Sequence, residues 1–131
     1  GHASKKIINA MNLIKPPFNV NQLAQTAATV ALKDKKFINQ SVKHNIIEAN
    51  KVKNILEKLN IFSNDVSANF LLLNFDKCKF SAKYVLNKLE SKGIVLRSTK
   101  DGYKIQNKLR LTIGSKKENI EFIATIKSIF N

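Results

Sequence analysis

The chain contains only two arginines among many lysines. Of the 23 lysine and arginine residues in the 131-residue sequence, only Arg97, in GIVLRS, and Arg110, in NKLRLTIGS, are arginine. A guanidinium group is a planar fork that binds a carboxylate or phosphate through two parallel hydrogen bonds, which a lysine ammonium cannot imitate. Two arginines in a lysine-biased composition are therefore candidates for anion binding. The competing interpretation is a pair of surface arginines in ordinary salt bridges.

Alternating apolar residues predict that both arginines lie on strands. In KLRLTIG, Leu109 and Leu111 share one face and Arg110 projects from the other. In IVLRS, Leu96 and Arg97 point to opposite faces in the same way. If these two strands are neighbours, both guanidinium groups converge on one spot.

The rest of the sequence predicts the elements that must position these strands. SANFLLLNF predicts a third, mostly buried strand. Helical patterns predict a short helix ending before Pro16 and Pro17, an alanine-rich helix capped by Asn19 or Asn21, a long amphipathic helix from Ile38 to Leu59, a helix from Ser81 that stops at Gly93, and a last helix opened by a Ser115–Glu118 capping box with Ile120, Ile123 and Ile126 facing inward. This order predicts an α+β fold, with a small mixed sheet of about three strands covered by helices and preceded by a long connecting helix.

The net charge of +14 raises the possibility of nucleic-acid binding. The lysines are spread over every segment, and no basic run carries interleaved aromatic residues or a zinc, KH or RRM signature. This distribution favours a solvated surface, so we expect nucleic acid to be an unlikely partner. A standalone basic module and an interaction domain without chemistry stay open as alternatives.

Histidine and cysteine give little sign of chemistry. The single cysteine, Cys78, excludes an intrachain disulfide and fits a reducing compartment. His44 lies off the apolar stripe of the long helix, so we expect it to be exposed, and we expect no metal site. Apolar runs are all shorter than the about 18 residues that a membrane helix needs, and no signal peptide is evident. We therefore expect a cytoplasmic protein.

The segments KPPFNVNQLAQTAA, SANFLLL, KGIVLR and LRLTIGSKKEN occur in this order. They resemble the C-terminal small domain of the histidinol-phosphate branch of the class I and II aminotransferases, over about Lys5 to Asn131. The resemblance implies that Arg110 binds the substrate carboxylate, and that Arg97 joins it around the substrate phosphate. Tyr103, in the connection between the arginines, either lines this site or covers the sheet edge.

The same resemblance implies a function for a larger parent enzyme. The reaction is amino transfer between histidinol phosphate or imidazole acetol phosphate and glutamate or 2-oxoglutarate, in histidine biosynthesis, with pyridoxal phosphate as cofactor. The implied partners are the small-molecule donor and acceptor, the large domain of the same enzyme and a second copy in a homodimer. Residues 1–34 correspond to an N-terminal segment and inter-domain helix, and 35–131 to the small domain.

The resemblance also implies that the chain lacks part of the machinery. In the family, the lysine that forms the Schiff base lies in a Ser-x-Ser-Lys-like motif upstream of the KPPFNVN segment. We therefore expect an inactive fragment, with no catalytic or cofactor-binding residue of its own. The small domain of a threonine-phosphate decarboxylase or of an aromatic aminotransferase is an alternative, because both have a similar C-terminal domain.

Overall fold

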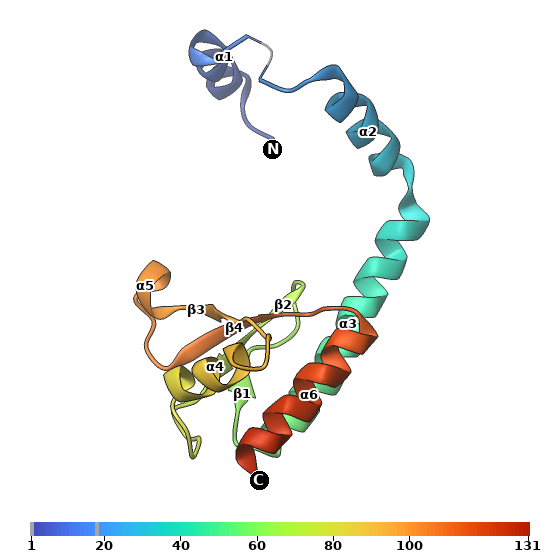
Figure 1. Cartoon of the computed structure of the whole chain (residues 1–131). Helices are drawn as coiled ribbons and strands as arrows, with labels where there is room; N and C mark the ends of the chain where they lie inside the picture. The colour runs from blue at the N-terminus through green and yellow to red at the C-terminus, as the bar shows by residue number, and fades with distance from the viewer. Residues whose placement is uncertain (1, 18) are drawn as a thin grey trace. The chain divides into compact units, whose positions relative to one another are not determined.

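The computed structural model describes residues 2–17 and 19–131 (Figure 1). The chain divides into two compact units, Gly1–Ile38 and Asn39–Asn131, and each is described by itself. The first unit contains α1 (Lys5–Ile14), α2 (Gln22–Lys33) and the first residues of α3 (Lys35–Glu57). α2 begins after Asn21, whose side chain accepts a hydrogen bond from the Ala24 backbone N–H at 2.7 Å. Asn21 is thus the cap, of the two asparagines that the sequence offered.

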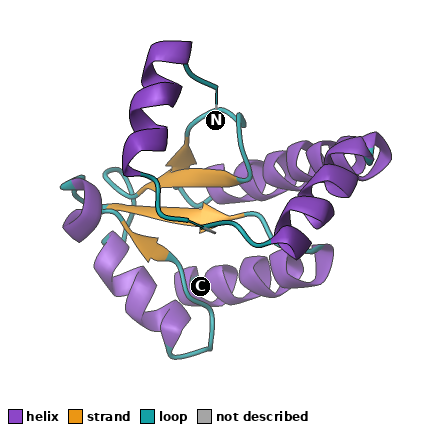
Figure 2. Ribbon diagram, turned by 90° about the horizontal axis from the view of Figure 1, so that it is seen from above, coloured by secondary structure: helices purple, strands orange, loops and turns teal. Residues whose placement is uncertain are grey.

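The second unit contains a four-stranded sheet with its helices (Figure 2). Its strands are β1 (Phe62–Ser63), β2 (Phe70–Asn74), β3 (Arg97–Ser98) and β4 (Lys108–Thr112), in the order β1-β2-β4-β3. The remaining elements are α4 (Ala82–Glu90), α5 (Lys100–Tyr103) and α6 (Lys116–Phe130). The α+β class is confirmed. The three pairings of this sheet are all antiparallel, so the predicted mixed sheet is wrong.

One face of the sheet forms the core of this unit. Leu71 and Leu73 of β2 lie opposite Leu111 and Leu109 of β4, and all four are buried. Apolar side chains of three helices cover this face: Ala49, Val52 and Leu56 of α3, Val85 and Leu89 of α4, and Phe122 and Ile126 of α6. The other face carries the alternate residues of the strands, which include both arginines.

Some local predictions do not hold in the structure. β1 was not predicted, and α5 occupies what was predicted to be a loop. β3 is limited to Arg97–Ser98, although the pattern of IVLRS predicted a longer strand. Ile120 is 66% exposed, not inward-facing, while Ile126 is buried as predicted. The inward stripe of α6 starts instead at Asn119, which is buried and hydrogen-bonded at the start of the helix.

Candidate anion-binding site

The two arginines lie directly opposite each other on neighbouring strands. Arg97 of β3 is the cross-strand partner of Arg110 of β4 in the antiparallel register. Directly paired residues project from the same face with their Cβ atoms about 5 Å apart, so the two cationic side chains start side by side. The two strands are neighbours, which meets the condition for convergence of the two guanidinium groups. Like charges in this relation repel each other unless an anion lies between them.

Protein carboxylates do not compensate this pair in the described part of the chain. The three ion pairs found there are all made by lysine, with Glu48, Asp65 and Asp76. The arrangement therefore differs from the ordinary surface salt bridges of the competing interpretation. It leaves two guanidinium groups that an external anion can bridge.

Each guanidinium group lies against an aromatic ring. The Cζ atom of Arg110 is 5.4 Å from the centroid of the Phe70 ring, and that of Arg97 is 5.8 Å from the centroid of the Tyr103 ring. Such contacts hold the guanidinium plane without using its N–H donors. Phe70 was not expected in the site. The alternation of SANFLLLN could have indicated it, because Phe70 and Leu72 lie on one face of their strand. Leu72 is the cross-strand partner of Arg110 on β2, so Phe70 shares the face of Arg110.

Arg110 has a donor without a partner. Its side chain is half-buried, and its Nε atom is buried with no hydrogen-bond partner among the described residues. A buried unsatisfied donor of a charged group destabilises the folded state by about 1–3 kcal/mol or more. Such exceptions in folded proteins need an explanation, and a ligand is one. An anion that reaches this fork gains the hydrogen bond that the protein leaves unmade.

The turn between β3 and β4 positions Tyr103. Thr99 is buried at the start of α5, and its Oγ1 lies 2.9 Å from the carbonyl of Ile105 and 3.0 Å from that of Lys108. These bonds close the connection on itself and bring the end of α5 beside β3. Tyr103 is 52% exposed and contacts Arg97. The structure thus brings Tyr103 together with Arg97.

A cleft of about 810 Å³ opens at the sheet edge beside the arginines. It is lined by 93–98, by 110–112 with Gly114, and by the first turns of α6, so both Arg97 and Arg110 contribute to it. Neighbouring strand residues point to opposite faces, so this lining places the cleft around the free edge of the sheet.

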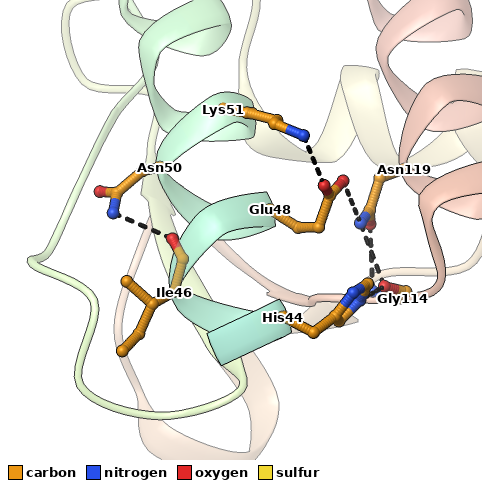
Figure 3. A network of polar contacts seen from close by, with 7 residues as sticks. All are labelled: His44, Ile46, Glu48, Asn50, Lys51, Gly114 and Asn119. Carbon is orange, nitrogen blue, oxygen red and sulfur yellow. Dashed lines mark hydrogen bonds and ion pairs between the residues drawn. The ribbon is translucent and has the colours of Figure 1, made fainter. Parts of the chain in front are cut away.

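The chain leaves β4 through a tightly held turn (Figure 3). Ser115 caps α6: its Oγ accepts from the Glu118 N–H at 3.4 Å, and the Glu118 carboxylate accepts from the Ser115 N–H at 2.7 Å. This is the predicted capping box. Hydrogen bonds from the hydroxyl and the backbone N–H of Ser115 to the carboxylate lower the pKa of Glu118. A Cβ atom on Gly114 would lie 2.8 Å from Glu118 Oε2, so a larger residue at this position would displace the Glu118 side chain.

α3 contacts the same turn through His44 and Glu48. His44 is half-buried, and its Nε2 donates to the carbonyl of Gly114 at 2.9 Å. The prediction of an exposed histidine is therefore wrong. The partner lies 70 positions along the chain, and helical periodicity carries no information about it. The hydrogen bond from Lys51 holds the pKa of the buried Glu48 below its ordinary value, against the effect of burial.

Pyridoxal phosphate is held by enzymes through a lysine, and no lysine of the described residues is fully buried. Most are exposed. The two half-buried ones, Lys53 and Lys108, lie 2.9 and 3.6 Å from the carboxylates of Asp65 and Asp76. Nor do His, Cys, Asp or Glu side chains of the described part form a group of three that could hold a metal ion. None of its helices is long and apolar enough to cross a membrane.

The chain is similar to known proteins over its whole length. The chain is 76% identical over 131 residues to a histidinol-phosphate aminotransferase of Pelagibacter ubique. The matched region covers all of this chain and 36% of that protein. It is 38% identical over 119 residues to that of Campylobacter hominis, covering 91% and 32%. The chain thus spans about a third of the length of the curated relatives it matches.

Solved structures share the fold. The histidinol-phosphate aminotransferase of Clostridium acetobutylicum aligns with a TM-score of 0.88 at 24% identity, over 98% of this chain and 39% of that one. An L-threonine-O-3-phosphate decarboxylase of Porphyromonas gingivalis aligns with a TM-score of 0.68 at 18% identity, over 97% and 39%. The family model described as aminotransferase class I and II matches residues 1–126. The chain therefore belongs to the class I and II aminotransferase family.

Proposed function

We propose that this chain is the C-terminal small domain, with its inter-domain helix, of a histidinol-phosphate aminotransferase. The reaction of the full-length enzyme is amino transfer between histidinol phosphate and 2-oxoglutarate, which yields imidazole acetol phosphate and glutamate. The 76% identity to a relative of that name over the whole chain supports this assignment. We propose the division into 1–34 and 35–131 for the parent, and a cytoplasmic location.

The observation that carries the proposal is the arginine pair, which no carboxylate of the described residues compensates. Arg110 lies directly opposite Arg97, and its buried Nε has no hydrogen-bond partner among those residues. Histidinol phosphate brings a phosphate and glutamate brings a carboxylate, and a guanidinium fork binds both. Arg110 serves both anions in turn, Arg97 serves chiefly the phosphate, and Tyr103 holds the plane of Arg97.

The cofactor and the rest of the site come from the parent. Pyridoxal phosphate, when bound there, takes the amino group from one substrate and gives it to the other. The residues of this chain bind and orient the substrate anion. Several large apolar side chains of the first unit are exposed, among them Leu13 at 88% and Leu23 at 84%, which supports packing against the large domain and a second copy in a homodimer.

The test is the exchange of each arginine for lysine in the full-length enzyme. Arg110→Lys keeps the charge and removes the fork. Since a charge-assisted hydrogen bond contributes about 1.5–3 kcal/mol, kcat/KM falls by about ten- to a hundredfold in both half-reactions. Arg97→Lys lowers kcat/KM for histidinol phosphate more than for glutamate. Lys116→Arg, the reverse exchange on the exposed start of α6, is the control and leaves kcat/KM unchanged for histidinol phosphate and for glutamate.

Thermal unfolding of the same variants decides between a ligand-binding and a structural arginine. Both side chains point away from the apolar core, so Tm changes little in either variant. An Arg110→Lys enzyme that melts several degrees lower while keeping its kcat/KM contradicts the proposal.

The net charge of +14 favours a second candidate function, a basic module that binds nucleic acid. Duplex DNA titrated into the purified chain separates the two. The aminotransferase proposal expects weak binding without sequence preference, lost steeply between about 50 and 200 mM salt. Submicromolar binding at physiological salt supports the second candidate.

A further inference from the structure

The turn that joins β4 to α6 is held from a helix that is distant in sequence. Gly114 lies four residues after Arg110, and its backbone bonds to Asn119 of α6 and His44 of α3. Glu48 of α3 in turn bonds to Asn119 (Figure 3). We call His44, Glu48 and Asn119, arranged around Gly114, the Gly114 clamp.

Asn119 satisfies both backbone groups of Gly114. Its Oδ1 accepts from the Gly114 N–H at 3.0 Å, and its Nδ2 donates to the Gly114 carbonyl at 3.1 Å. The Nδ2 group also donates to Glu48 Oε2 at 3.4 Å. Since Glu48 and the carbonyl only accept, the amide has one workable orientation. Any residue that lacks either the donor or the acceptor breaks this arrangement.

His44 adds a second donor to the same carbonyl. A carbonyl oxygen cannot donate, so the bond of 2.9 Å from His44 Nε2 requires a proton on that nitrogen. Glu48 is held in place by Lys51, whose Nζ lies 2.8 Å from Oε1. The clamp therefore ties the buried side of α3 to the end of the arginine strand, while both α3 and α6 pack into the core.

The direction of the Arg110 side chain depends on the backbone of β4. Its Nε has no hydrogen-bond partner in the described part of the chain, so no hydrogen bond to Nε fixes the fork, and the strand and the Phe70 ring help to set where it points. Two parallel hydrogen bonds to one anion tolerate little angular error. Misplacement of a binding group by about 1 Å is enough to lower a rate by about a hundredfold.

We propose that His44, Glu48 and Asn119 are positioning residues that hold Arg110 in register with Arg97 for anion binding. This inference rests on the proposed function, because it assigns the clamp to the same arginine pair. The clamp residues do not touch the substrate. They act through Gly114 and the end of β4.

The test compares two isosteric exchanges in the full-length enzyme. Asn119→Asp removes the donor to Gly114 and sets a carboxylate against Glu48, whereas Asn50→Asp makes the same change on the exposed side of α3. Among the described residues, the Asn50 side chain donates only to Ile46 of its own helix, so it is a matched control. The measurements are KM and kcat for histidinol phosphate, the inhibition constant of inorganic phosphate, and Tm.

Asn119→Asp is expected to raise KM and the inhibition constant of phosphate by about tenfold, equivalent to about 1.4 kcal/mol, with kcat changed less. In the double variant Glu48→Gln, Asn119→Asp, the amide introduced at position 48 can donate to the carboxylate introduced at position 119. This variant is expected to recover part of the affinity for histidinol phosphate and inorganic phosphate. His44→Phe keeps the ring volume, removes one donor and raises both constants by a smaller factor. This second variant decides the question if Asn119→Asp does not fold.

Unchanged constants in folded Asn119→Asp and His44→Phe enzymes, with only Tm lowered, overturn the inference. Arg110→Lys, measured alongside, separates the two proposals. If Arg110→Lys raises KM and the clamp variants do not, only the inference fails. If Arg110→Lys also leaves KM unchanged, the proposed anion site itself is wrong.

Discussion

Replacing Gly114 by alanine is expected to destabilise the second unit, although the same exchange often stabilises a protein. A Cβ atom here would lie 2.8 Å from Oε2 of Glu118, closer than real Cβ atoms approach, and 3.1 Å from its Cβ, which is a tight contact. Glu118 must then move away from the backbone N–H of Ser115, to which it now bonds at 2.7 Å. The capping box at the start of α6 is lost.

The magnitude follows from two opposed effects. Loss of a helix cap destabilises by about 0.5–2 kcal/mol, and steric displacement adds to it. Alanine lowers the conformational entropy of the unfolded chain, and this effect offsets about 0.4–1 kcal/mol of the lost stability. The net result is a loss of about 1 kcal/mol, or about 4–8 °C in Tm for a domain of this size.

Gly102 provides the matched control. It lies in α5, its φ is not positive, and a Cβ atom there would meet nothing within 4 Å. Gly102→Ala therefore gains about 0.5–1 kcal/mol, because alanine favours a helix over glycine. Urea and thermal unfolding of both variants, followed by circular dichroism, measure the difference. If the two exchanges shift stability in the same direction, the assignment of Gly114 to close packing against Glu118 is refuted.

Three further changes test the packing and electrostatics. Glu48→Gln should lower the stability of the folded state at pH 7, because the hydrogen bond from Lys51 depresses the pKa of Glu48. The stability that the Glu48 carboxylate contributes is present above the ordinary pKa of 4.5 and is lost as pH falls below it. The urea midpoints of the variant and the original protein should therefore converge at about pH 3. Asn107→Ala should cost about 2 kcal/mol or more in the same assay, because Asn107 has a φ of 50°, accepts from the Ala82 N–H at 2.8 Å and donates to Asp76 Oδ1 at 3.2 Å. Asn107→Gly should lose the two side-chain hydrogen bonds but add no backbone strain. Ile126→Ala should lower the free energy of unfolding by about 2–5 kcal/mol in chemical unfolding, because the Ile126 side chain is buried. Ile120→Ala should change it by no more than about 0.5 kcal/mol, because the Ile120 side chain is exposed. Equal losses of stability in the two variants would contradict the observed rotation of α6.

The sequence predicted those features that depend on neighbours in the chain. The capping box of Ser115 and Glu118 is local, and so is the alternation that sets Arg110 opposite to Leu109 and Leu111. Gly93, with a φ of 79°, ends the turn after α4 as its position predicted. The roles of the arginines and of Tyr103 came from the family resemblance, and they stay proposals.

The missed features depend on partners far along the chain. β1 is two residues long and exists through its pairing with β2, so no periodicity marks it. His44 is half-buried because Gly114 is near it in space. Ile120 was predicted to face inward because it is hydrophobic. The hydrogen bonds of the buried Asn119 fix the rotation of α6 instead, and this rotation leaves Ile120 exposed. Tertiary contacts decide such positions.

The strand order has a consequence for the synthesis of the protein on the ribosome. β4 is the last strand to be made, yet it lies inside the sheet between β2 and β3. Until residues 108–112 emerge, β2 has one free edge and the leucines of its buried face lack their partners, a state that favours aggregation. Rapid completion of the chain would shorten this state, and a chaperone would shield it. Arg97 and Arg110 come together only in that last step.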